Sequence, residues 1–178
     1  MTKPAIILFA AAAALGAAGT WSEPAEITHD DSICVTYRAR LAGDYLIVEA
    51  KHEEPWHTYS LDNEVLAKEK LAGKMALGID QPTVIRAKEG LEIAGPWLHT
   101  PPEDISKPEL RIFAWGYSHT ALLAAKAKRT GTGPATIGIR GQACSATTCK
   151  NVNLTLTLPA EAGPAPDLKA LAPARVAN

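Results

Sequence analysis

Apolar and polar side chains alternate along several short segments of this chain, which is the pattern of half-buried β-strands. In residues 32–41 every second residue from Ile33 is apolar, and a turn at Gly43 and Asp44 leads into residues 45–50, which are rich in β-formers. We expect these two segments to form a hairpin. Further strands are expected at residues 82–85, 91–93, 110–113, 121–128, 136–141 and 152–158.

One segment carries the start and stop signals of a helix. Asp62 or Asn63 can cap its beginning and Gly73 can end it. Residues 95–108 contain four prolines and are expected to form a loop. Many short strands with little helix predict an all-β fold, an antiparallel β-sandwich with one short helix. Periodicity alone leaves a small barrel open as the alternative.

The two ends of the chain differ from its middle. Lys3 precedes an apolar, alanine-rich run that ends near Gly19 and is shorter than the roughly 20 residues of a spanning helix. We interpret residues 1–19 as a secretory signal peptide, with an uncleaved anchor as the alternative. Residues 20–31 are interpreted as a polar lead-in, residues 32–159 as the domain, and the Ala- and Pro-rich residues 160–178 as a disordered tail.

Export and charge limit the classes of partner. The signal predicts a periplasmic or otherwise exported protein with no stable membrane insertion after cleavage. The 178 residues include 18 Lys and Arg and 19 Asp and Glu, so the strong basic field typical of nucleic-acid binding is missing and we expect no nucleic-acid partner. Disulfides persist in an exported protein. The chemistry of the cysteines therefore matters most.

Cys144 and Cys149 lie between two predicted strands, with four residues between them. At the ends of a tight loop two such cysteines can approach to bonding distance. A bond that closes so short a loop stabilises by only about 2 kcal/mol. The spacing leaves a redox-active pair, a structural staple and a metal site open, and Lys150 beside Cys149 favours a lowered thiol pKa. Cys34, in an alternating strand, is interpreted as a buried core thiol.

Other side chains add weaker expectations. A copper or zinc site requires the fold to bring both late cysteines to one or two histidines, and the candidates are His52, His57, His99 and His119. Phe113, Trp115 and Tyr117 alternate, which is typical of core residues or of a cover over a reactive site. The sequence contains no phosphate-binding glycine loop, dinucleotide fingerprint or hydrolase elbow, so no cofactor is expected.

Four segments together resemble a known family. They are residues 55–60 (PWHTYS), 81–83 (QPT), 95–97 (GPW) and the stretch 141–149 (GQACSATTC). In this order they are similar to the N-terminal periplasmic domain of the thiol:disulfide interchange protein DsbD, over roughly residues 32–159. The sequence departs from the family at two places. The family has one more residue between its cysteines, and the aromatic and proline residues that often follow the pair are replaced here by Lys-Asn-Val-Asn at residues 150–153.

The resemblance implies an immunoglobulin-like sandwich and a redox dithiol of the protein-disulfide reductase type. Cys144 and Cys149 are then the redox pair, with Cys149 forming mixed disulfides, and Phe113, Trp115 and Tyr117 are the nearest candidates for an aromatic cap. The implied partners are other thiol–disulfide proteins, including a separate membrane electron donor. The alternative is a non-enzymatic sandwich module that binds a protein, copper or zinc and uses the same cysteines as a staple or as metal ligands.

Overall fold

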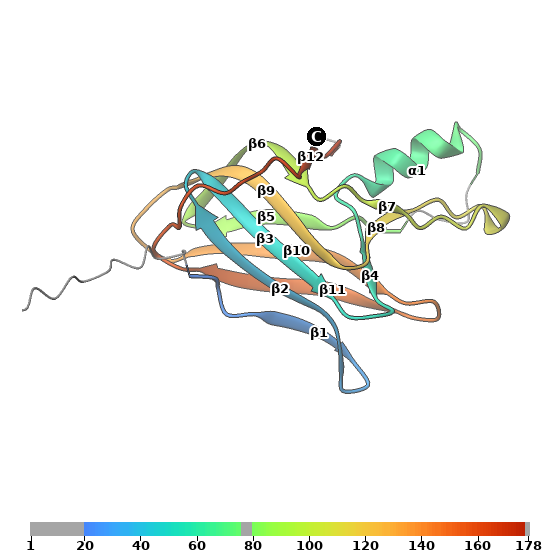
Figure 1. Cartoon of the computed structure of the whole chain (residues 1–178), viewed down its shortest axis with the longest axis horizontal. Helices are drawn as coiled ribbons and strands as arrows, with labels where there is room; N and C mark the ends of the chain where they lie inside the picture. Colours follow the sequence, from blue (N-terminus) through green and yellow to red (C-terminus); the bar gives the residue numbers. More distant parts are fainter. Residues whose placement is uncertain (1–19, 76–79, 177–178) are drawn as a thin grey trace, which may run out of the picture.

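The computed structural model describes residues 20–75 and 80–176 as a sandwich of two β-sheets (Figure 1). The predicted signal peptide, residues 1–19, lies outside the described residues. The elements in chain order are β1 (Ala25–His29), β2 (Ser32–Ala42), β3 (Tyr45–His52), β4 (His57–Tyr59), α1 (Asn63–Leu71), β5 (Val84–Glu89), β6 (Leu91–His99), β7 (Glu103–Asp104), the 3-10 turn η1 (Pro108–Leu110), β8 (Trp115–Tyr117), β9 (Thr120–Arg129), β10 (Ala135–Cys144), β11 (Cys149–Leu158) and β12 (Ala172–Pro173).

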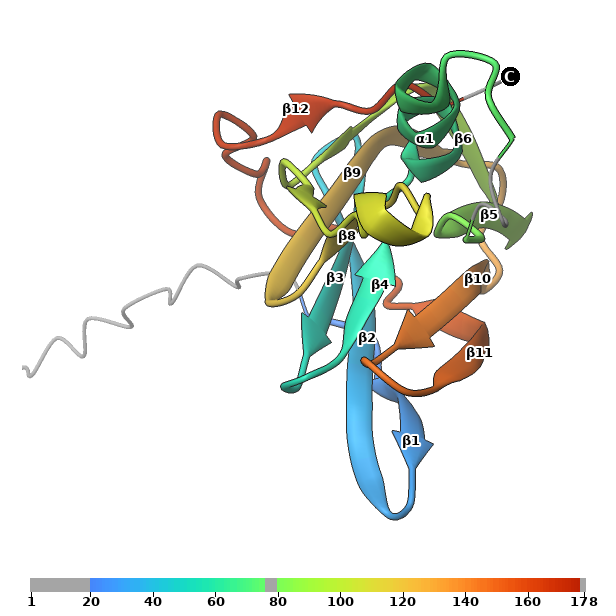
Figure 2. The same cartoon turned by 90° about the vertical axis from the view of Figure 1, so that its right-hand side faces the viewer.

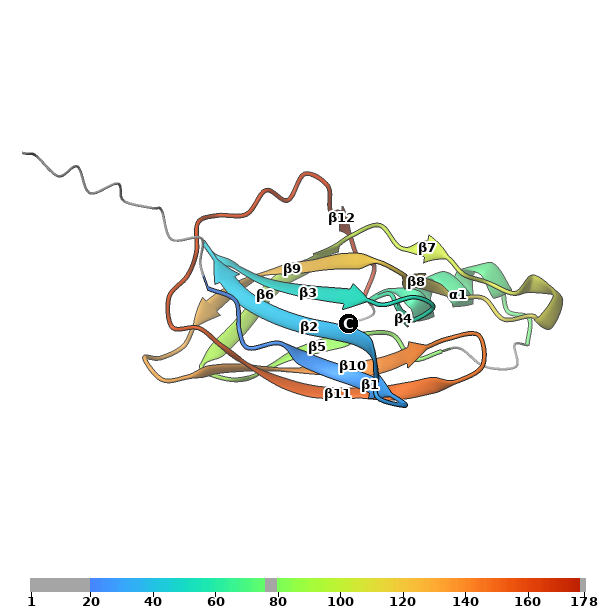
Figure 3. The same ribbon diagram turned by 60° about the horizontal axis from the view of Figure 1, so that its bottom comes forward.

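The strands form two layers (Figure 3). The first sheet has the order β1-β2-β3-β9-β6-β12, and the second has the order β11-β10-β4-β8-β7 with β5 also paired to β10. Every pairing between these strands is antiparallel. The expected all-β antiparallel sandwich with one short helix is therefore confirmed, and so is the hairpin formed by β2 and β3.

The core lies between the two sheets and follows from the alternation. Tyr37 and Ala39 of β2 belong with Ile137 and Ile139 of β10 to one cluster of buried residues. Leu46 of β3 belongs to the same cluster and is fully buried. Burial of each large apolar side chain contributes about 1.5–3 kcal/mol, so this shared interior holds the layers together.

Helix α1 extends the sandwich at the end where the β10–β11 turn lies (Figure 1). It begins after Asp62, as predicted, and it ends one residue before the expected position because Ala72 takes the left-handed conformation at φ 50°. The Asp62 carboxylate does not cap the helix. It accepts hydrogen bonds from the Ser60 hydroxyl at 2.8 Å and from the Arg175 backbone N–H at 3.2 Å.

Both terminal segments of the described chain belong to the sandwich. In the expected lead-in, β1 pairs with β2, and in the expected disordered tail, β12 pairs with β6 (Figure 2). Leu168 and Leu171 pack on a cluster on the first sheet, and the Ala174 N–H donates to the Trp97 carbonyl at 2.8 Å. These contacts are made from within a segment whose average composition predicts disorder. Within the described part of the chain, no helix is both long and apolar enough to cross a membrane.

Candidate functional site: the Cys144–Cys149 disulfide

Cys144 and Cys149 form a disulfide at the end of the β10–β11 hairpin. Cys144 is the last residue of β10 and Cys149 is the first of β11, and the two lie directly opposite each other, with their Cα atoms 4.0 Å apart. The Ser145 N–H donates to the Thr148 carbonyl at 2.8 Å and closes the four-residue loop between them. The hairpin itself thus brings the two sulfurs together.

The two cysteines differ in their exposure to solvent. Cys144 is 1% exposed, whereas Cys149 is an exposed residue. The difference arises from strand order, because β10 has neighbours on both sides while β11 is the edge strand of its sheet. A disulfide with one exposed half and one buried half can be attacked from outside mainly at the exposed half.

The disulfide lies on the outer face of the second sheet. Ile139 and Ala143 of β10 point into the core, and Cys144, with the opposite parity, points away from it. On the neighbouring strand β4, Cys144 lies opposite His57. Cys149, Cys144 and His57 therefore form a row over three adjacent strands. Directly opposite residues share one face of a sheet, and the three side chains are therefore neighbours.

A cover made of residues 103–114 buries Cys144. The Ile105 N–H donates to the Ala114 carbonyl at 2.9 Å, and Lys107 and Ile112 form a second bridge within the cover. Ile105 and Ala114 pack with Tyr59 and Cys144 in one small cluster. The cover approaches closely because Gly116, opposite Tyr59 in β8, has no side chain in the way.

A hollow of about 340 Å³ lies beside the disulfide. Its lining includes His57, Tyr59, Asp80, Lys107 and both cysteines. Burial lowers the pKa of His57, the Asp80 carboxylate raises it in part, and the Lys107 ammonium lowers it further. Burial, followed by the charge of Asp80, raises the pKa of the Tyr59 hydroxyl. At neutral pH the hollow therefore offers a neutral imidazole and a neutral phenol beside the sulfurs.

Asn63 ties the walls of the hollow together. It is fully buried at the start of α1, and its Nδ2 donates to the Asp80 carbonyl at 2.8 Å. Its Oδ1 accepts the Trp115 N–H of β8, also at 2.8 Å. The helix thereby fixes Asp80 on one side of the hollow and the end of the cover on the other.

Three buried or half-buried histidines predict how stability depends on pH. Burial lowers the pKa of His52, His57 and His99 from the usual value near 6.5, so the unfolded chain binds more protons than the folded one as the pH falls below that value. The free energy of unfolding is therefore expected to decrease from pH 7 to pH 5. Urea titrations across this range measure it, and His99→Gln should flatten the slope. A free energy that stays level or rises on acidification contradicts the prediction.

The aromatic residues predicted as a cap lie elsewhere. Tyr117 is buried in the core, where its hydroxyl bonds to His99 Nδ1 at 2.7 Å. Phe113 and Trp115 are half-buried, and neither is among the described residues that line the hollow. The residues that alternate with them along the chain, Ile112 and Ala114, line the hollow instead. Tyr59 carried a signal in the sequence, since it belongs to the PWHTYS segment, whereas Ile105 and Ala114 carried none.

Charges around the cysteines also differ from the sequence expectation. Lys150 adjoins Cys149 but has the opposite parity on β11, and its charge acts on Cys34, lowering a thiol pKa that burial raises. The cation that lines the hollow is Lys107. Cys34 is 0% exposed in the core, as predicted. Among residues 20–75 and 80–176, no three His, Cys, Asp or Glu side chains are grouped as metal ligands.

Comparison with known proteins finds similarity only at the level of the fold. No family model matches the chain, and no curated protein matches it. The chain is similar to the reduced N-terminal domain of DsbD from Neisseria meningitidis, with 15% identity and a TM-score of 0.44 over 70% of this chain and 90% of that one. It is also similar to a chain of the complex between the DsbD and PilB N-terminal domains from the same organism, with 14% identity and a TM-score of 0.46 over 74% of this chain and 85% of that one.

Proposed function

We propose that this protein is an exported thiol–disulfide exchange protein that carries two electrons through Cys144 and Cys149. The observation that supports the proposal is the unequal exposure of a single disulfide beside a lined hollow. Exposure of the residue Cys149 gives another protein access to the bond. Cys144, which is covered, stays close enough to Cys149 to resolve the mixed disulfide.

A purely structural role explains the bond less well. In the chain-entropy model a bond that closes six residues contributes about 2 kcal/mol, whereas one that closes about 100 residues contributes nearly 5 kcal/mol. The β10–β11 hairpin is already held by a continuous register from Ala135 opposite Leu158 to Cys144 opposite Cys149. In the chain-entropy model the Cys144–Cys149 bond therefore contributes less stability than a bridge between distant segments would.

The exchange proceeds in two steps that balance. In the reduced protein the Cys149 thiolate attacks a disulfide of the substrate protein, a Cys149–substrate bond forms, and the first substrate sulfur leaves as a thiolate that takes up a proton. The Cys144 thiolate then attacks Cys149 Sγ, restores the Cys144–Cys149 bond and releases the second substrate sulfur. Two electrons have passed to the substrate, which is left as a dithiol.

Regeneration needs a dithiol donor. One thiolate of the donor attacks Cys149 Sγ, which forms a donor–Cys149 mixed disulfide and frees Cys144 as a thiolate. The donor's second thiolate then attacks the donor sulfur of that mixed disulfide. Cys149 leaves as a thiolate, and the donor is left as a disulfide. Because export places this protein outside the cytoplasmic thiol pool, we propose a separate membrane protein as that donor. His57 is placed, by its position opposite Cys144, to exchange a proton with the buried sulfur.

The reduction potential of the pair tests the proposal. Equilibration with glutathione or dithiothreitol redox buffers, followed by alkylation and mass spectrometry, measures the fraction reduced. We expect a value between about −120 and −270 mV, the range of exchange proteins, with Cys34→Ala giving the same value. A potential below about −300 mV is typical of structural disulfides and contradicts the proposal.

A further inference from the structure

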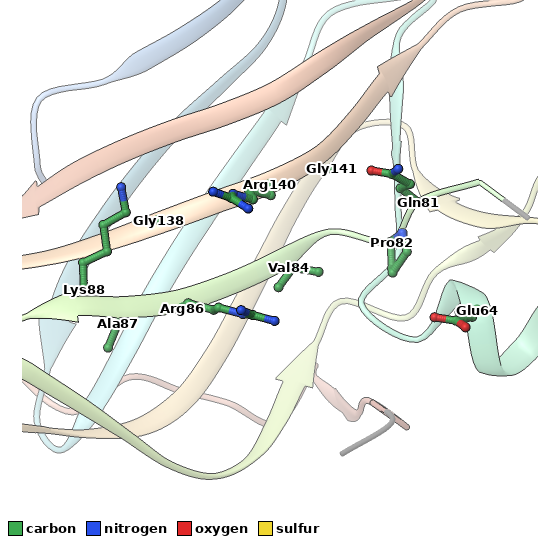
Figure 4. Close-up of a pocket in the computed structure, with 10 residues that line it drawn as sticks. All are labelled: Glu64, Gln81, Pro82, Val84, Arg86, Ala87, Lys88, Gly138, Arg140 and Gly141. Carbon is green, nitrogen blue, oxygen red and sulfur yellow. The ribbon is translucent and has the colours of Figure 1, made fainter.

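A second hollow lies on the outer face of the same sheet, along β5 and β10 (Figure 4). Its volume is about 500 Å³. Arg86 and Lys88 project into it from β5, and Arg140 projects from β10, while Glu64 lies at its far end on α1. We call this hollow the basic groove.

The positive charges of the basic groove are not neutralised. Within the described part of the chain, neither Arg86 nor Arg140 pairs with a carboxylate. Lys88 Nζ donates to the neutral Thr155 hydroxyl at 2.6 Å. Glu64 is already engaged by Lys68, one turn along α1, at 2.5 Å. The protein as a whole carries a formal charge of −1, so the groove is a local positive site on a nearly neutral protein.

A glycine shapes the floor of the groove. Gly138 lies directly opposite Arg86, and a Cβ at this position would come within 2.8 Å of Lys88 Cε. The absence of a side chain lets Lys88 cross the strand and reach Thr155 on β11. Arg86 and Lys88 therefore project from the same face of β5, beside a position of β10 without a side chain, which suits the approach of a negatively charged segment.

The basic groove and the disulfide share one face of β10. Arg140, Gln142 and Cys144 follow one another at every second position, and residues on one face of a strand are spaced by about 6.6–6.8 Å. Arg140 is therefore about 13 Å along the strand from Cys144. The Gln142 side chain, between them, accepts the Gln81 N–H at 3.4 Å, and Gln81 lines the groove.

We propose that the basic groove binds an acidic polypeptide segment of the protein that exchanges disulfides with Cys149. This proposal rests on the proposed function. The carboxylates of the segment lie against Arg86, Arg140 and Lys88, about four extended residues from the cysteine that reaches Cys149. Complementary charge of this kind acts chiefly by speeding encounter and selecting partners, and it weakens as salt is added.

Synthetic peptides test the proposal. Each peptide carries one cysteine as a mixed disulfide with thionitrobenzoate, followed about four residues later by a run of Asp or, in the neutral analogue, of Asn. Attack by Cys149 of the reduced protein on the peptide sulfur releases coloured thionitrobenzoate, the better leaving group. We expect the acidic peptide to react at least about fivefold faster at low salt, with the advantage lost near 0.5 M salt.

Two double variants locate the effect. Arg86→Gln with Arg140→Gln should abolish the advantage of the acidic peptide and leave the neutral peptide's rate unchanged. Lys126→Gln with Lys128→Gln removes the same charge from exposed positions of β9 in the other sheet and should preserve the advantage. Equal rates for the two peptides on the unaltered protein overturn the proposal and leave the proposed function standing.

Failure of exchange itself is a separate outcome. If neither peptide releases thionitrobenzoate, the proposed function fails, and the groove is then tested by fluorescence anisotropy with a cysteine-free acidic peptide. Binding to the unaltered protein at least about fivefold tighter than to the Arg86→Gln, Arg140→Gln variant supports an acidic-segment site. Equal binding of the acidic peptide to both proteins overturns it. Displacement of the acidic peptide by the neutral peptide as effective as its displacement by sulfate also overturns it, because binding then does not depend on charge.

Discussion

Replacement of Cys144 by serine is expected to make the protein retain its disulfide partners covalently, whereas replacement of Cys149 by serine is expected to retain almost none. Cys149 is the exposed half of the pair and Cys144 is 1% exposed under Ile105 and Ala114. Without Cys144, the mixed disulfide at Cys149 has no second thiol to resolve it. Non-reducing electrophoresis with a disulfide-bonded model protein measures the retained fraction, which we expect to differ by at least about tenfold between the two variants.

Cys34 must be removed from this comparison. It is a third thiol, buried in the core, and Cys34→Ala in both variants ensures that the bond formed is at the intended residue. Mass spectrometry of the retained species identifies the bonded cysteine. Equal retention by the two serine variants would mean that the assignment of Cys149 as the attacking residue is wrong.

Replacement of Gly116 by alanine is expected to lift the cover from Cys144. A Cβ on Gly116 would lie 2.6 Å from the Thr58 carbonyl oxygen and 2.9 Å from Ile105 Cδ1, so either β8 or the cover must move. Overpacking of this kind costs about 1–3 kcal/mol of unfolding free energy. In the reduced protein we expect alkylation of Cys144 to become at least about tenfold faster, measured by mass spectrometry after timed quenching.

A glycine in an open turn provides the control for Gly116. Gly131 has no heavy atom within 4 Å of a built Cβ, so Gly131→Ala should change neither stability nor alkylation of Cys144. Unchanged protection of Cys144 in Gly116→Ala, with normal folding, would contradict the account of how the cover buries this sulfur.

The predictable parts of this molecule depend on local signals. The alternation from Ile33 to Leu41 gave the β2–β3 hairpin because one face of each strand is buried. The approach of Cys144 and Cys149 follows from the sequence because the two residues lie on neighbouring strands joined by a short turn. In both cases residues close in the sequence are also in contact, so patterns read over about ten residues are sufficient.

The remaining features depend on distant contacts. The four prolines of residues 95–108 predict a loop, yet β6 continues past Pro96 because its register to β9 shifts between Ala94 and Leu98, which accommodates the proline. The sequence also does not show which alternate residues of the cover face the disulfide. Ile112 and Ala114 rather than Phe113 and Trp115 face the disulfide, because residues 103–114 fold back on Tyr59 of a strand far away in the sequence.

The rate at which the folded protein's disulfide is reduced shows whether a reductant reaches Cys149 without unfolding the protein. A dithiol reductant is added to the oxidised protein without denaturant, and the loss of the Cys144–Cys149 bond is compared with the global unfolding rate under the same conditions. We expect a rate that rises in proportion to reductant concentration and exceeds the unfolding rate by at least about a hundredfold, because Cys149 is reachable in the folded state. A rate independent of reductant concentration and equal to the unfolding rate would show that the bond is sealed in the native protein, and it would contradict the account.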